Sequence, residues 1–152
     1  MSDRQNPALT EVFLRIEHDT AEPEVLTAAI GVTPTYSARR GQLTADGKGG
    51  PYPWNVWVLS SAYAVVSKDT RAHFQWLLAS IGSRGAEIRT LREQGYRIEI
   101  HCLWVSKGGY GGPELSPEIM RGLADLGLDI YFDVAMPEQG SVSRRCSAGV
   151  AD

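Results

Sequence analysis

The sequence predicts an α+β fold: a two-layer sandwich in which helices cover one face of a ferredoxin-like, mainly antiparallel, four-stranded sheet. Four segments alternate apolar and polar residues, which is the period of a strand that buries one face. Segments with a helical spacing of apolar residues lie between these strands. Because one face of each strand is more apolar than the other, we expect helices on one side of the sheet rather than on both.

Residues 10–18 form the first expected strand, with Val12, Leu14 and Ile16 on its inward face. A short helix should follow, because Pro23 suits a first helical turn and Gly31 is a typical helix end. The next stretch, 33–53, is rich in glycine and proline, which argues against regular structure. A loop longer than about 12–15 residues is usually functional or disordered.

The second strand is expected over 54–60, with Trp54, Val56 and Val58 pointing inward and Trp57 outward. A helical pattern then covers residues 69–94 and is interrupted by glycines at positions 82 and 85. We therefore expect a helical hairpin inserted between the second and third strands.

The third strand is expected over 97–105, with Ile100 and Trp104 inward. Ser116 can cap a helix that has Pro117 at its first position and ends at Gly127. The last strand should cover 128–134 and point Ile130 inward.

The chain has 152 residues, the size of one domain with an ordinary hydrophobic core. We assign residues 10–136 to this domain and expect disordered tails over 1–9 and 137–152. The net charge of −3 argues against a nucleic-acid partner, and two cysteines are too few for a disulfide framework. Without an apolar run of membrane length or an apolar signal core, we expect a cytoplasmic protein with no membrane partner.

The outward face of the predicted sheet carries large side chains. They are Phe13, Trp57, His101 and Tyr131. Apolar groups rimmed by charge are typical of a protein interface, so these residues are our candidates for an interaction face. The alternative is that the 33–53 loop covers this face.

Two loops could instead form a small-molecule site. The 33–53 loop carries Arg39 and Arg40, and a glycine-rich turn over 107–113 carries Lys107 and Tyr110. The arginines could bind an anionic group, while Trp54 or Tyr110 stacks on a flat ligand. The alternative is that the arginines form ordinary surface ion pairs. Residues 41–48 lack the spacing of a phosphate-binding P-loop.

Catalytic and cofactor motifs are not identified. His18, His73 and His101 are far apart and show no metal-ligand spacing, so we expect no metal site. His101 near Glu99 could act as a general base, but it also fits an ordinary surface histidine. No nucleophile-elbow motif is present and no cofactor is expected, so whether the protein is an enzyme stays open.

Several short motifs occur in a fixed order along the chain. They are Pro23-Glu24, Gly31-Val32-Thr33-Pro34-Thr35, Arg40-Gly41, Trp54, His73-Phe74 with Trp76-Leu77-Leu78, Trp104-Val105-Ser106, Leu115-Ser116-Pro117-Glu118 and Leu123 with Leu126-Gly127-Leu128. In this order the chain resembles a bacterial family of small proteins, domain of unknown function 4279 (DUF4279). The resemblance spans about residues 10–135. It implies a compact single domain, but no activity, substrate or cofactor.

The leading hypothesis is therefore a non-enzymatic module that binds a protein, either another protein or a second copy of itself. The alternative is a protein or enzyme that binds an anionic small molecule between the 33–53 loop and the 107–113 turn.

Overall fold

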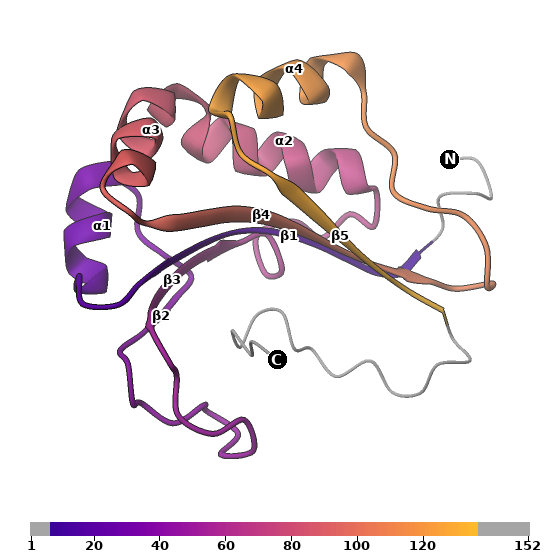
Figure 1. Cartoon of the computed structure of the whole chain (residues 1–152). Helices are drawn as coiled ribbons and strands as arrows, with labels where there is room; N and C mark the ends of the chain where they lie inside the picture. The colour runs from indigo at the N-terminus through magenta and orange to yellow at the C-terminus, as the bar shows by residue number, and fades with distance from the viewer. Residues whose placement is uncertain (1–6, 137–152) are drawn as a thin grey trace.

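The computed structural model describes residues 7–136. They form one sheet, and the helices all lie on one face of that sheet (Figure 1). The elements are, in order, β1 (Pro7–His18), α1 (Pro23–Ile30), β2 (Tyr36–Ala38), β3 (Asn55–Ser60), α2 (Thr70–Ile81), a 3₁₀ turn (Gly82–Arg84), α3 (Gly85–Glu93), β4 (Arg97–Ser106), α4 (Pro117–Leu126) and β5 (Ile130–Ala135). The predicted α+β class is confirmed. Residues 7–9 belong to β1 and not to a tail, whereas 1–6 and 137–152 lie outside the described residues.

The sheet has five strands in the order β2-β3-β1-β4-β5. Neighbouring strands are antiparallel except β4 and β5, which are parallel. The predicted four-stranded ferredoxin-like sheet is therefore not confirmed. The prediction missed β2, which is three residues long and lies inside the stretch rich in glycine and proline. The prediction also left the direction of the last strand open. The connection through α4 returns the chain to the other end of the sheet, so β5 runs parallel to β4.

Most helix ends lie where the sequence places them. Gly31 and Gly127 end α1 and α4 with φ angles of 74° and 67°, the left-handed region that glycine adopts without strain. The side chain of Asp69 accepts the backbone N–H of Arg71 at the start of α2, and Ser116 accepts that of Ile119 at the start of α4.

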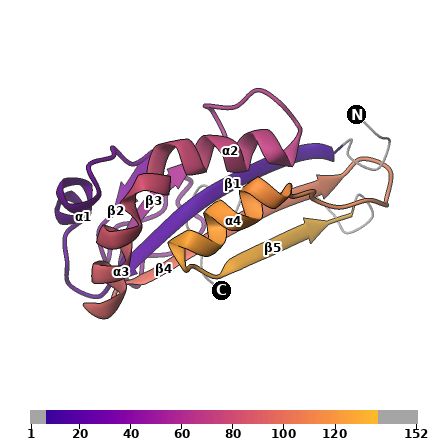
Figure 2. The ribbon, with the colours of Figure 1, turned by 90° about the horizontal axis from the view of Figure 1, so that it is seen from above.

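The helical hairpin between β3 and β4 is not formed. Figure 2 shows that α3 bends away from the end of α2 instead of folding back along it. Gly82 and Gly85 both have φ of −59°, so they continue the helical path through the 3₁₀ turn. Glycine permits a chain reversal but does not require one.

The main core lies between the helices and the sheet. Its strand residues are Val12, Leu14, Ile16, Trp57, Leu59, Ile98, Ile100 and Cys102, with Ile130 partly buried against them. The predicted outward direction of Trp57 is therefore wrong: the residue is 0% exposed and faces the helices. Its indole N–H donates to Thr27 Oγ1 of α1 at 3.1 Å.

A second, smaller apolar cluster lies on the opposite face, which we call the open face. It comprises Phe13, Ala38, Tyr52, Val56 and Val58, with Tyr36 packed against it. Val56 and Val58 therefore point away from the helices, which reverses the predicted orientation of this strand. The cause is that all six residues of β3 are buried, so alternation does not show which face meets the main core.

The 33–53 stretch is more regular than predicted. It contains β2, and an isolated bridge joins Leu43 to Pro51 farther along. The backbones of Gln42 and Tyr52 also hydrogen-bond across the stretch. This arrangement turns the ring of Tyr52 onto the open face, where it packs in the second cluster.

Candidate functional site

Three rings stack across the open face of the sheet. Phe13 of β1 lies opposite His101 of β4, which lies opposite Tyr131 of β5. The ring centroids of Phe13 and His101 are 4.9 Å apart with an interplanar angle of 3°, and those of His101 and Tyr131 are 5.2 Å apart with an angle of 20°. We call these three residues the aromatic ladder. Cross-strand register places them in one row, and strand pairing holds them there.

The ladder runs from the interior to the surface. Phe13 is 2% exposed, His101 is half-buried, and Tyr131 is 48% exposed. His101 Nε2 lies 3.0 Å from Glu99 Oε2, and a carboxylate only accepts, so the imidazole N–H donates. Rings cover both faces of this imidazole. His101 therefore contributes to a stacked surface, with Glu99 fixing its orientation.

Acidic side chains surround the ladder. Arg15 forms an ion pair with Glu17, and Arg97 lies within 3.4 Å of both Glu17 and Asp19. The charged residues that strand alternation places on the open face are Glu11, Glu17, Glu99, Asp133, Arg15 and Arg97. Acids thus outnumber bases among these residues, although Glu11 is buried.

The chain covers one half of the open face. The hydroxyl of Tyr36 donates to that of Tyr52 at 2.7 Å, and Tyr52 is nearly fully buried. Burial and this hydrogen bond raise the pKa of Tyr52 well above its usual value. The 33–53 stretch therefore covers the half formed by β2, β3 and part of β1. The half formed by β4 and β5 presents Tyr131 to the solvent.

Of the predicted interaction residues, the structure brings together Phe13, His101 and Tyr131. Trp57 is not among them, because it lies on the other face in the main core.

The predicted ligand residues do not meet. Arg39 forms ion pairs with Glu22 at 2.5 Å and with Glu24 at 2.9 Å, and all three side chains are exposed. The Arg40 backbone N–H donates to Asn55 Oδ1 at 2.7 Å. Trp54 lies under the guanidinium of Arg97, whose central carbon is 4.2 Å from the ring centroid.

The 107–113 turn, which carries Lys107 and Tyr110, lies at the opposite end of the sheet from Arg39, Arg40 and Trp54 (Figure 1). β1 pairs through Glu17 with Arg97 at the start of β4 and through Pro7 with Ser106 at its end. The 12 residues of β1 therefore separate the two loops by roughly 35 Å. Tyr110 is exposed, and its carbonyl accepts from the Ser106 hydroxyl at 2.9 Å. Arg39 and Arg40 therefore do not share one pocket with the 107–113 turn.

A buried Ser–His pair was missed by the sequence analysis. Ser61 Oγ lies 2.6 Å from His73 Nδ1 and accepts the Val12 N–H at 2.9 Å. His73 Nε2 donates to the Ser67 carbonyl, 2.6 Å away, so Nδ1 accepts the proton of Ser61. Ser61 is 0% exposed and cannot reach a substrate. The pair connects the segment after β3 to α2. The available sequence signal was that His73 lies one helical turn before Leu77, which places His73 on the buried face of the helix.

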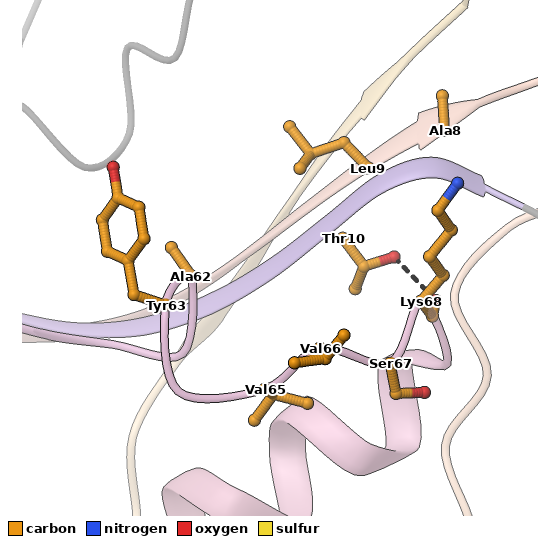
Figure 3. Close-up of a pocket in the computed structure, with 9 residues that line it drawn as sticks. All are labelled: Ala8, Leu9, Thr10, Ala62, Tyr63, Val65, Val66, Ser67 and Lys68. Carbon is orange, nitrogen blue, oxygen red and sulfur yellow. Dashed lines mark hydrogen bonds between the residues drawn. The ribbon is translucent and has the colours of Figure 1, made fainter.

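That segment also forms one wall of a pocket of about 360 Å³ (Figure 3). The other wall is the start of β1, and the two are joined where Thr10 Oγ1 donates to the Lys68 carbonyl at 3.0 Å. The lining is mostly apolar and includes Leu9, Val65 and Val66, with the Lys68 side chain at one side. Nothing in the sequence analysis indicated this pocket.

Residues 7–136 contain neither a metal site nor a membrane-spanning helix. No group of three or more His, Cys, Asp and Glu side chains in this range could hold a metal ion. None of the helices in this range combines the length and the hydropathy that a bilayer-spanning helix needs. Cys102 is buried in the main core, and burial raises the pKa of its thiol to about 12, so it stays protonated at neutral pH.

The fold and the site define a small α+β domain with helices on one sheet face and an aromatic, acidic patch on the other. Residues 8–137 match the model of a family described as domain of unknown function (DUF4279), and the chain belongs to this family. No match was found among curated proteins or among solved structures.

Proposed function

We propose that this protein is a non-enzymatic module that binds another protein through the β4–β5 half of its open face. The observation that supports this most is the aromatic ladder. It ends in an exposed tyrosine on a part of the sheet that the 33–53 stretch leaves uncovered. Aromatic side chains that are stacked and held by paired strands lose little side-chain entropy on binding. Aromatic residues serve as anchors in protein interfaces for the same reason.

The charge of the face indicates the chemistry of the partner. Glu99 lies beside the ladder with its side chain 40% exposed, and Asp133 follows two residues after Tyr131 on the same face. A partner with lysine or arginine around an apolar centre would complement this patch. The proposed partner is therefore a protein with a basic surface.

The test is retention of proteins on immobilised domain from an extract of the cells that produce it. The test variants are Tyr131→Ser and Glu99→Lys, and the matched control is Met120→Ser, an exposed apolar residue on α4. We expect a protein retained by the wild type and the control, and lost with both test variants. Its retention should weaken with added salt, because screening reduces charge attraction. No retained protein, or retention that both variants leave unchanged, would overturn the proposal.

A second candidate function rests on the pocket at Lys68. Its volume of about 360 Å³ is within the range of small-molecule sites, and its apolar lining with one cation suits a small carboxylate with an apolar body. A thermal-shift screen of such acids tests it: at about 100 times Kd a ligand should stabilise the wild type by roughly 2.7 kcal/mol. The stabilisation should shrink in Lys68→Met.

A further inference from the structure

β5 forms one edge of the sheet, and no other strand within residues 7–136 pairs with its outer side. Exposed edges usually carry lysine, proline or a bulge that prevents pairing with another chain. Ile130–Ala135 contains neither lysine nor proline, its pairing with β4 shows no bulge, and its one charged residue is Asp133. Instead Tyr131 is 48% exposed, Phe132 46% and Val134 40%, so apolar groups are exposed on both faces of the edge. Figure 2 shows that β5 lies outside α4, so no helix overhangs it.

The direction of the free backbone groups follows from the pairing with β4. Ile100 N–H donates to the Asp129 carbonyl at 3.1 Å, so Asp129 directs its backbone groups toward β4. These directions alternate from residue to residue along a strand. Ile130, Phe132 and Val134 therefore direct their N–H and C=O groups outward, where another strand can pair with them.

We propose that β5 pairs antiparallel with β5 of a second copy of this chain, with a two-fold axis at Phe132. In this register Phe132 pairs with Phe132 of the second copy, and Ile130 pairs with Val134. All outward-pointing backbone groups of these residues then form hydrogen bonds across the axis. Two sheets become one continuous sheet, and the two open faces lie side by side.

The side chains of β5 are complementary to themselves in this register. On the helix side, apolar residues meet apolar residues. On the open face, Tyr131 lies opposite Asp133 of the second copy at the close spacing of a pair without backbone hydrogen bonds. The tyrosine hydroxyl can donate to that carboxylate.

Shifting the register by two residues in either direction brings like charges together. With the axis at Tyr131, Asp129 lies opposite Asp133 of the second copy. With the axis at Asp133, the two copies of Asp133 face each other. Like charges opposite one another destabilise strand pairs, and both shifts lose backbone hydrogen bonds. The axis at Phe132 avoids both costs. In this register the exposed apolar side chains of β5 meet each other and every outward backbone group is paired, and this self-complementarity is the reason to assign a second copy as the occupant of the edge.

An interface of two short strands is small, so the dimer should be weak, with a Kd on the order of micromolar. Sedimentation velocity over about 1–500 μM tests it, and we expect a dimer fraction that rises with concentration. Phe132→Lys places two charges at the axis and should raise Kd at least tenfold. The matched control is Val25→Lys, an exposed valine of α1, which packs against β3, and it should change Kd less than about twofold. A wild type that stays monomeric, or equal effects of the two variants, would overturn the proposal.

Cysteine cross-linking tests the register in a Cys146→Ser background, and circular dichroism checks that each variant is folded. Directly opposed residues in this kind of pair have Cα atoms about 4.5 Å apart, which a disulfide can span. A mixture of Tyr131→Cys and Asp133→Cys should give disulfide-linked dimers under mild oxidation, while each variant alone should not. Dimers of Tyr131→Cys alone, or of Asp133→Cys alone, would indicate a shifted register and contradict the axis at Phe132.

Dimer formation through β5 and partner binding through the ladder depend on different side chains. Phe132 points to the helix side, away from the aromatic ladder, and Glu99 lies on β4, away from the edge. Phe132→Lys should abolish dimers and leave a ladder-dependent partner bound. Glu99→Lys should release the partner and leave the dimer intact.

Discussion

The imidazole of His101 lies parallel to the ring of Phe13, with centroids 4.9 Å apart and planes 3° apart. The two residues belong to different strands and face each other across the pair of β1 and β4. Tyr131 extends the stack to the surface, so one row of side chains joins the second apolar cluster to a solvent-exposed patch.

The two ends of this row should differ strongly in their contribution to stability. Phe13 is buried and Tyr131 is half exposed. Phe13→Ala should lower the free energy of unfolding by about 3–5 kcal/mol, because it leaves a cavity in the second cluster. Tyr131→Ala should lower it by less than about 1 kcal/mol. Urea denaturation measures both; equal losses would contradict the gradient of burial along the ladder.

Removing the acceptor of the Trp57 indole tests the corrected orientation of β3. Thr27→Val has nearly the volume of threonine but leaves the buried indole N–H without the Thr27 hydroxyl. The expected loss is about 1–3 kcal/mol of unfolding free energy, the cost of an unsatisfied buried donor. Thr20→Val, at an exposed position, is the control and should change stability by no more than about 0.5 kcal/mol. If Trp57 pointed to the open face, Thr27→Val would not lower the free energy of unfolding by this amount.

Stability should fall when the solution is acidified through the range of His73. Burial lowers the pKa of His73 below its usual 6.5, and the Ser67 carbonyl and Asp69 oppose this only in part. The unfolded chain therefore binds a proton at higher pH than the native one. The contribution of His73 is complete above about pH 6.5 and is lost as the pH falls through the lower native pKa, by at most about 1.4 kcal/mol per pH unit.

Urea midpoints measured from about pH 8 to pH 5 test this linkage. His73→Gln removes the titrating group, so its stability profile should be flatter than that of the wild type over this range. Parallel profiles for the two proteins would show that His73 does not carry the acid sensitivity.

Two glycines should respond to alanine with opposite signs. Gly127 ends α4 with a positive φ, and alanine there is strained although its Cβ would meet nothing closer than Arg92 Nη1 at 3.8 Å. Gly127→Ala should cost about 1–2 kcal/mol. Gly82 has a right-handed φ of −59° and open space around the added Cβ, so Gly82→Ala should stabilise by about 0.5–1 kcal/mol. Thermal unfolding of both variants measures the difference.

Local chemistry made much of the secondary structure predictable. Pro23 and Gly31 bound α1, and Ser116 and Gly127 bound α4, because capping and φ preferences act within one or two turns. The alternation of β1 and β4 also indicated their inward faces, since Phe13 and His101 alternate with clearly apolar neighbours. Hence three of the four predicted interaction residues lie together.

Residues that are far apart in the chain decided the rest. β3 is buried on both faces, so alternation within Asn55–Ser60 could not tell that Trp57 faces α1 and Val56 faces Tyr52. The buried pair of Ser61 and His73 depends on how the segment after β3 meets α2.

By itself the sequence determined where the helices end, that the fold is α+β, and which residue types could form an aromatic face, because these properties depend on near neighbours. The tertiary structure decided the fifth strand, the face that Trp57 occupies and the roughly 35 Å between the two candidate ligand loops. Strand order and direction depend on contacts between segments that are distant in the chain. A local sequence pattern does not indicate which of these segments will pair.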